Sequence, residues 1–208
     1  MTQSLDQFAA EKLANRRKNN LLRDLFDTHR DGPITVKRDG KTLISFCCND
    51  YLNLSHDPRL IKAGHDALDL FGTGAGASRL ITGNHPLLSA LEAELAALKG
   101  TEAAIVFGSG YLTNLGVIPA LMGQGDLILI DELAHACLMS GTRLSGADEI
   151  RFPHNDLTYV AKVLADKRGD YDHVMIITDG VFSMDGDLAP VADLQNLADQ
   201  HDAWLMTD

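Results

Sequence analysis

Residues 174–208 have the sequence VMIITDGVFSMDGDLAPVADLQNLADQHDAWLMTD, in which apolar and polar runs alternate. The apolar run Val174–Ile177 predicts a buried strand, and the polar residues 178–187 predict a loop after it. Residues 190–200 carry apolar side chains at helical spacing, and a second apolar run, Ala203–Met206, predicts another strand. A strand, a loop, a helix and a strand in this order are the repeating unit of a parallel α/β sheet.

Both predicted strands end in polar side chains. Asp179 and Ser183 follow the first strand, and Asp208 follows the second. Ligands of parallel α/β sheets bind at the carboxyl ends of the strands, so these residues mark a candidate site. Taken alone, the run Asp185-Gly186-Asp187 is typical of a turn, and Asp208 is compatible with a simple strand end.

The whole string carries more information than its parts. TDGVFSMDGD, then an amphipathic helix, then HDAWLMTD resembles the cofactor segment of the α-oxoamine synthases, fold-type I enzymes that use pyridoxal 5′-phosphate (PLP). The resemblance extends over nearly all of the chain. It implies that Asp208 pairs with the pyridinium nitrogen of PLP and that Ser183 bonds its phenolic oxygen. A carboxylate about 4 Å from that nitrogen favours the protonated ring by roughly 4 kcal/mol before desolvation.

The resemblance also predicts the architecture. The fold class is α/β, with an N-terminal segment and the first part of the mostly parallel large-domain sheet of the fold-type I PLP transferases, an α/β/α sandwich. Residues 1–55 are expected to form an N-terminal helix and a small hairpin, and 56–208 a partial PLP-binding large domain. The lysine that binds PLP in the family follows later, so the chain is expected to be truncated and 1–208 alone inactive.

Composition narrows the class of protein. The chain has 208 residues, is 45% hydrophobic and carries a formal net charge of −11 without long runs of one sign. This charge disfavours nucleic acid and anionic membranes as general partners. The odd set Cys47, Cys48 and Cys137 predicts reduced thiols. Neither a signal pattern nor a spanning apolar run is found, so a soluble cytoplasmic protein is expected.

The N-terminal part contains the predicted substrate residues. Residues 4–27 have near-helical apolar spacing with a basic cluster that on its own is typical of a solvated face. By resemblance, Arg23 pairs with the distal carboxylate of an acyl chain, a task suited to arginine. Asn49 begins a family string, NDYLNL, in which Asn53 replaces a glycine and tolerates the same left-handed backbone. Ser78 lies in the glycine loop 72–79, which follows a predicted helix over 58–71 and therefore does not match a dinucleotide loop.

The middle of the chain supplies the predicted phosphate and ring contacts. Ala103–Phe107 predicts a strand that leads through a small-residue turn into a helix, where backbone N–H groups favour an anion. Within 1–208 that strand is expected to lack its neighbour and to leave a sheet edge exposed. The resemblance implies that Ser109, Gly110 and Tyr111 bind PLP here.

A second predicted strand, over 126–131, leads to DELAHA. A lone His135 at a strand end is usually structural, and His135-Ala-Cys137 is a weak metal pair because no further ligands are near it in the sequence. The family's D-x-x-x-H-A string implies instead that His135 stacks on the PLP ring beside the bound amino acid. His135 and Asp208 are therefore the predicted catalytic residues.

The implied reaction is the decarboxylative condensation of a small amino acid with an acyl-CoA. The RFPHND and WLMTD strings favour the member that joins alanine to a pimeloyl thioester, giving 8-amino-7-oxononanoate for biotin. Asp179 stands where that member usually has glutamate, so 2-amino-3-ketobutyrate ligase, 5-aminolevulinate synthase and serine palmitoyltransferase stay open. A homodimer with a shared active site is implied. A non-catalytic partner subunit and an α/β domain unrelated to PLP stay open as well.

Overall fold

The computed structural model describes residues 3–208 and divides the chain into two compact units. The first unit ends at Ser78, and the second spans Arg79–Asp208. The boundary expected between residues 55 and 56 concerns the family's domains and stays a prediction. Residues 1 and 2 of that expected N-terminal segment lie outside the described residues.

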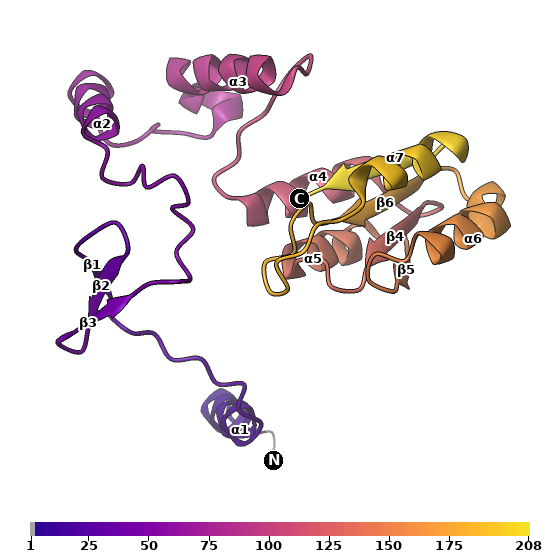
Figure 1. Cartoon of the computed structure of the whole chain (residues 1–208), viewed down its shortest axis with the longest axis horizontal. Helices are drawn as coiled ribbons and strands as arrows, with labels where there is room; N and C mark the ends of the chain where they lie inside the picture. The colour runs from indigo at the N-terminus through magenta and orange to yellow at the C-terminus, as the bar shows by residue number, and fades with distance from the viewer. Residues whose placement is uncertain (1–2) are drawn as a thin grey trace. The chain divides into compact units, whose positions relative to one another are not determined.

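The first unit has two helices and a small antiparallel sheet (Figure 1). Its elements are α1 (Leu5–Lys18), β1 (His29–Arg30), β2 (Thr35–Arg38), β3 (Lys41–Ile44) and α2 (Pro58–Phe71). The sheet order is β1-β2-β3, which confirms the predicted hairpin and adds one short strand. The helical pattern over 4–27 is only partly realised, because α1 ends at Lys18 and Asn20 adopts a left-handed backbone with φ of 56°.

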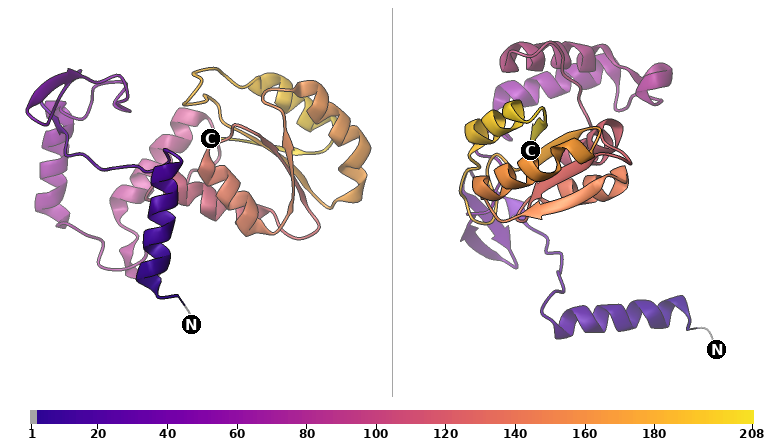
Figure 2. Two further views of the ribbon diagram at one scale, coloured as in Figure 1. Left: turned by 90° about the horizontal axis from the view of Figure 1, so that it is seen from below. Right: turned by 90° about the vertical axis from the view of Figure 1, so that its right-hand side faces the viewer.

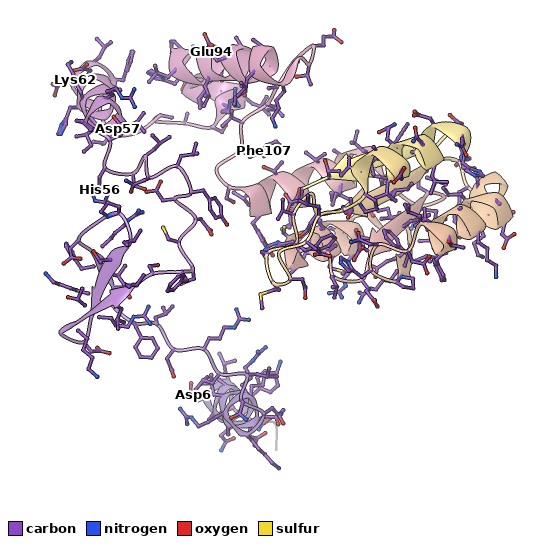
Figure 3. All side chains as sticks on the ribbon, in the orientation of Figure 1. Asp6, His56, Asp57, Lys62, Glu94 and Phe107 are labelled. Atoms are coloured by element: carbon purple, nitrogen blue, oxygen red, sulfur yellow. The ribbon has the colours of Figure 1, made fainter. Side chains whose placement is uncertain are left out.

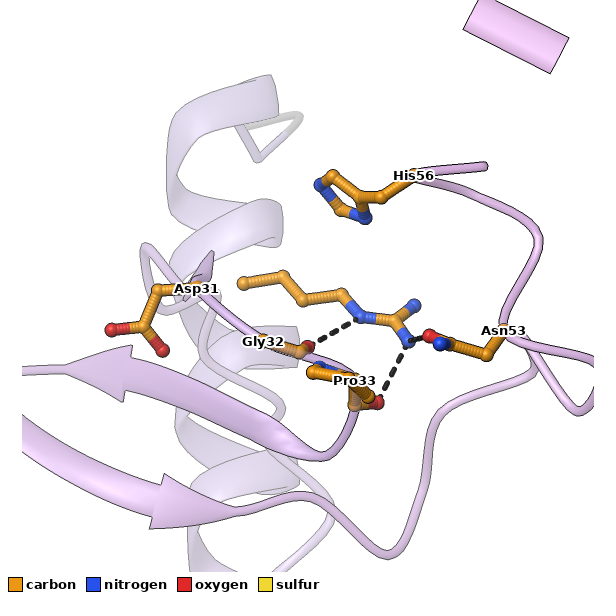
Figure 4. Close-up of a pocket in the computed structure, with 6 residues that line it drawn as sticks. Asp31, Gly32, Pro33, Asn53 and His56 are labelled. Atoms are coloured by element: carbon orange, nitrogen blue, oxygen red, sulfur yellow. Dashed lines mark hydrogen bonds between the residues drawn. The ribbon is translucent and has the colours of Figure 1, made fainter. Parts of the chain in front are cut away.

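The guanidinium of Arg30 connects two loops of the first unit through hydrogen bonds to Gly32, Pro33 and Asn53, three residues that Figure 4 labels. Its guanidinium donates to the backbone oxygens of Gly32 and Pro33 at 3.2 and 2.9 Å. It also binds Oδ2 of Asp50 at 2.7 Å and Oδ1 of Asn53 at 3.1 Å, so it ties the segment after β3 to the β1–β2 turn. Asn53 has φ of 53°, as its place in the family's glycine position predicts.

The second unit contains a parallel sheet with helices on both faces (Figures 1 and 2). Before the sheet come η1 (Arg79–Gly83), α3 (Pro86–Lys99) and α4 (Gly110–Leu121). The alternating part consists of β4 (Leu127–Asp131), α5 (Ala136–Ser145), β5 (Asp148–Phe152), α6 (Leu157–Lys167), η2 (Arg168–Asp170), β6 (Val174–Thr178), α7 (Val191–Gln200) and β7 (Trp204–Thr207). The strand order is β5-β4-β6-β7, and every pair is parallel.

Alternation along the strands builds two cores. Leu127, Leu129 and Ile176 point to one face and pack with buried residues of α6 and α7. Ile128 and Ile130 point to the other face and pack with residues of α4 and α5. Strands covered on both faces are expected to be continuously apolar, and β4 and β6 are buried at every position. The predicted α/β/α sandwich is confirmed.

One local prediction is wrong, and one helix was not predicted. Ala103–Phe107 forms no strand, and Phe107, labelled in Figure 3, lies in the loop that leads into α4. Val106 donates its backbone N–H to Oε1 of Glu92, and its carbonyl oxygen accepts from Arg79. Side chains therefore provide the hydrogen bonds that a neighbouring strand would provide, and none of the described strands pairs with this segment. A strand pattern specifies apolar burial but cannot supply a neighbouring strand. The pattern also did not predict α5.

Candidate functional site

The sheet has one point at which its connections change sides. After β4 the chain passes to α5 on one face, and after β6 it passes to α7 on the other. Because β4 and β6 are neighbours, the loops that follow them diverge to opposite faces at the carboxyl ends of these strands. Ligands of open α/β sheets bind at such a switch point, so this end of the sheet is the candidate site.

Three residues predicted from the sequence meet there. The backbone N–H of His135, at the start of α5, donates to Oδ1 of Asp179 at 3.0 Å across the switch point. Asp208 follows β7, and its backbone bonds both Thr178 and Gly180 at 3.0 and 2.9 Å. These bonds fix Asp208 at a rigid strand end beside the loop that follows β6.

Cys137 joins this group, which the sequence did not predict. Its Sγ lies 2.7 Å from Nδ1 of His135 and 3.9 Å from Oδ2 of Asp208. Asn114, a buried residue of α4, donates Nδ2–H to the same sulfur at 3.1 Å. The only sequence signal was the spacing His-Ala-Cys, because the approach of α4 and β7 depends on packing between elements distant in the chain.

The site carries unbalanced negative charge. Burial raises the pKa of the Asp179 carboxyl, the hydrogen bond from the His135 N–H lowers it, and the nearby Asp208 carboxylate raises it further. Among residues 3–208, neither Asp179 nor Asp208 forms an ion pair with a lysine or arginine. The arrangement therefore favours a cationic group between His135 and Asp208.

Ser183 lies exposed in the loop between β6 and α7. The loop folds on itself as Val181 pairs with Leu188, and Gly186, at φ of 78°, donates its N–H to the carbonyl of Phe182 at 2.7 Å. Ser183 is thus carried by a short hairpin at the same end of the sheet. Its bond to the phenolic oxygen of the cofactor stays a prediction.

A second cluster holds that hairpin against the ends of β4 and β5. His154 contacts Oδ1 of the fully buried Asp131 at 3.0 Å through Nδ1 and Oδ2 of Asp187 at 2.8 Å through Nε2. The hydrogen bond to Asp187 is the main cause that raises the pKa of His154, and Asp131 adds to it while burial opposes it. The sequence predicts here only that residues 154–156 cap a helix over 157–167, and Asp156 does accept from the Tyr159 N–H at 2.9 Å.

The predicted phosphate residues lie at the start of α4. Ser109 caps the helix by accepting from the Leu112 N–H at 3.2 Å, and Gly110 and Tyr111 form its first turn. Asn114, one turn later, contacts Cys137, so the amino end of α4 lies beside the amino end of α5. A helix start with free N–H groups suits an anion such as a phosphate.

Arg23, Asn49 and Ser78 belong to the first unit, where all three are exposed. Their predicted substrate contacts stay predictions. The roles of the residues in the second unit stay predictions too, although the structure brings His135, Asp179 and Asp208 together.

Known proteins resemble this chain over almost its full length. The family model for aminotransferase class I and II matches residues 41–208. The 8-amino-7-oxononanoate synthase of Granulibacter bethesdensis is 58% identical over 206 residues, which are 99% of this chain and 54% of that protein. The chain therefore spans about half the length of the curated relatives it matches.

Solved structures give the same picture of the fold. The serine palmitoyltransferase of Sphingomonas wittichii superposes with a TM-score of 0.88 at 32% identity, covering 99% of this chain and 53% of that one. A serine palmitoyltransferase from S. paucimobilis with a bound PLP–myriocin aldimine gives a TM-score of 0.86 at 29% identity over the same shares. Of the helices within residues 3–208, none combines the length and apolar character needed to cross a membrane.

Proposed function

The chain belongs to the aminotransferase class I and II family, and from that membership we propose that it is part of a PLP-dependent acyltransferase of the α-oxoamine synthase type. The observation that carries this proposal is the meeting of His135 and Asp208 at the switch point of the sheet. A ring-covering histidine and a carboxylate at a strand end are the two groups that the resemblance requires. Their convergence from distant parts of the sequence supports the cofactor assignment.

The residues present fit PLP, which when bound supplies an electron sink for the amino-acid carbon. Asp208 would hold the proton on the ring nitrogen, since its carboxylate has no other cationic partner among the described residues. His135 would cover one face of the ring. The α4 start at Ser109–Tyr111 would accept the phosphate, and Ser183 would donate to the phenolic oxygen.

The substrates proposed are alanine and a pimeloyl thioester, with 8-amino-7-oxononanoate, CoA and CO₂ as products. Support comes from the 58% identity, over 99% of this chain, to the 8-amino-7-oxononanoate synthase of Granulibacter bethesdensis. In this assignment Arg23 binds the distal carboxylate of the acyl chain. A homodimer and a cytoplasmic location are part of the same proposal, as is the requirement for the lysine that the family carries later in its chain.

The cofactor assignment is tested by titrating the Asp208→Asn variant with PLP. The quenching of Trp204 fluorescence measures how much PLP is bound. We expect the affinity to fall at least about tenfold, equal to about 1.4 kcal/mol, because the ring nitrogen loses its counter-charge. Asp166→Asn is the matched control, since Asp166 is an exposed aspartate of α6, away from the strand ends. Equal PLP affinity of Asp208→Asn and the parent would reject the site.

Substrate choice is tested by assaying the natural full-length protein with two substrate pairs, alanine plus pimeloyl-CoA and glycine plus acetyl-CoA. CoA release with the first pair alone supports the biotin reaction. Turnover of the second pair favours 2-amino-3-ketobutyrate ligase. PLP binding without turnover of either pair favours the non-catalytic partner subunit.

A further inference from the structure

Three side chains with different metal-binding atoms converge at the candidate site. A ring nitrogen of His135, Sγ of Cys137 and a carboxylate oxygen of Asp208 all lie within 4.8 Å of one another. His135 is the N-cap of α5, Cys137 lies in the first turn of that helix, and Asp208 follows the end of β7. The sequence shows only the weak pair His135 and Cys137, and the fold adds a third ligand from 71 residues beyond Cys137.

The donor atoms lie close together but already take part in hydrogen bonds. Nδ1 of His135 accepts the Cys137 N–H at 3.3 Å, so in this tautomer the ring proton sits on Nε2, and an ion that binds Nδ1 replaces this long contact. The sulfur of Cys137 accepts from Asn114, which fixes it without occupying all of its lone pairs. Asp208 is exposed and forms no ion pair with a lysine or arginine among the described residues.

The distances suit a small tetrahedral ion. Bonds of about 2.0–2.3 Å to nitrogen, oxygen and sulfur separate the ligand atoms of Zn²⁺ by roughly 3.4–3.6 Å. The observed separations of 2.7 Å from nitrogen to sulfur and 3.9 Å from sulfur to oxygen lie on either side of that value. Shifts of less than about 1 Å in these two contacts would therefore accommodate such an ion. Exposed His135 and Asp208 leave the entrance open to solvent.

We propose that His135, Cys137 and Asp208 form a binding site for a divalent transition-metal ion of the Zn²⁺ class, with water as the fourth ligand. A thiolate and an imidazole select zinc or cobalt over magnesium and calcium, which prefer oxygen ligands. The site overlaps the cofactor position, because His135 and Asp208 serve both. The ion and PLP therefore exclude each other, a consequence that rests on the proposed function, whereas binding of the ion does not.

The direct test is a Co²⁺ titration of the chelator-treated protein, in which the thiolate-to-cobalt charge-transfer band reports binding. Zn²⁺ is then added as a competitor to measure its own affinity. We expect one ion per chain and a charge-transfer band that Cys137→Ser abolishes. Cys47→Ser is the matched control, since Cys47 is an exposed thiol of the first unit. Asp208→Asn keeps the sulfur and should weaken Zn²⁺ binding at least about tenfold. A band that persists in Cys137→Ser, or unchanged Zn²⁺ affinity in Asp208→Asn, would overturn the site.

A second titration separates the two proposals. Adding PLP to the zinc-loaded protein should release Zn²⁺ to a fluorescent indicator. Zinc bound at the cluster and not released by PLP would uphold the metal site and contradict the cofactor position. Failure of Cys137→Ser to change metal binding, together with weaker PLP binding by Asp208→Asn, would reject the metal site alone.

Discussion

At the scale of single residues, His154 links stability to pH. Its folded-state pKa lies above the ordinary 6.5, chiefly through the hydrogen bond to Asp187. The bonds to Asp187 and Asp131 are therefore fully present below pH 6.5, and their contribution is lost as pH rises through the higher folded-state pKa. Asp187→Asn should lower the pKa of His154 and reduce this loss of stability, measured by NMR titration and urea unfolding.

The control for that experiment is Asp185→Asn, which removes an exposed carboxylate from the same hairpin. It should leave the titration of His154 unchanged. If both variants shift the pKa of His154 equally, general electrostatics and not the Asp187 contact sets it.

Glu92 has the opposite pH dependence. Its pKa falls from 4.5 to about 2, first because Arg79 donates to it and then because the Val106 N–H does. Its contribution to stability is present above pH 4.5 and is lost as pH falls toward 2. Glu92→Gln should be less stable at neutral pH and should lose less stability on acidification, measured by denaturant unfolding. Glu94→Gln, an exposed neighbour labelled in Figure 3, should match the parent.

At the scale of elements, α4 and α5 approach too closely for a side chain at one position. A Cβ at Gly141 would lie 2.5 Å from the carbonyl oxygen of Asn114. Gly141→Ala should therefore force the helices apart and cost about 1–3 kcal/mol, measured as a lower melting temperature. Gly169→Ala, where an added Cβ meets nothing within 4 Å, is the control. Equal melting temperatures would show that α4 and α5 separate without cost.

The elements also show what a sequence pattern can predict. The sequence predicts helices over 58–71, 86–99 and 157–167, because proline, glycine and capping residues mark their ends. The structure has the helices Pro58–Phe71, Pro86–Lys99 and Leu157–Lys167 with these limits. Ala103–Phe107 is equally apolar, but a strand needs a partner, and partnership is a property of the fold. The predicted site shares this limit. Its residues at strand ends were found, whereas the contact of Asn114 with Cys137 depends on helix packing.

At the scale of the whole molecule, the parallel sheet is what converts these separate residues into one site. The strand–loop–helix–strand order over 174–206 predicts a parallel α/β sheet, and the family resemblance predicts the α/β/α sandwich. The strand order β5-β4-β6-β7 was not predicted, and it is the order that places His135 opposite Asp179. The candidate site residues could therefore be predicted from the sequence, whereas the strand order that brings them together could not.

The bond from His135 to Asp179 has a consequence for how the chain acquires its structure. It joins residues 44 apart, and it can form only after β4 and β6 have paired through the crossover between them. Non-local parallel pairing is a slow step in folding. The ligand site is consequently assembled late, and partly folded chains lack it. Any molecule that binds there acts on the finished state alone and draws the folding equilibrium toward it by mass action.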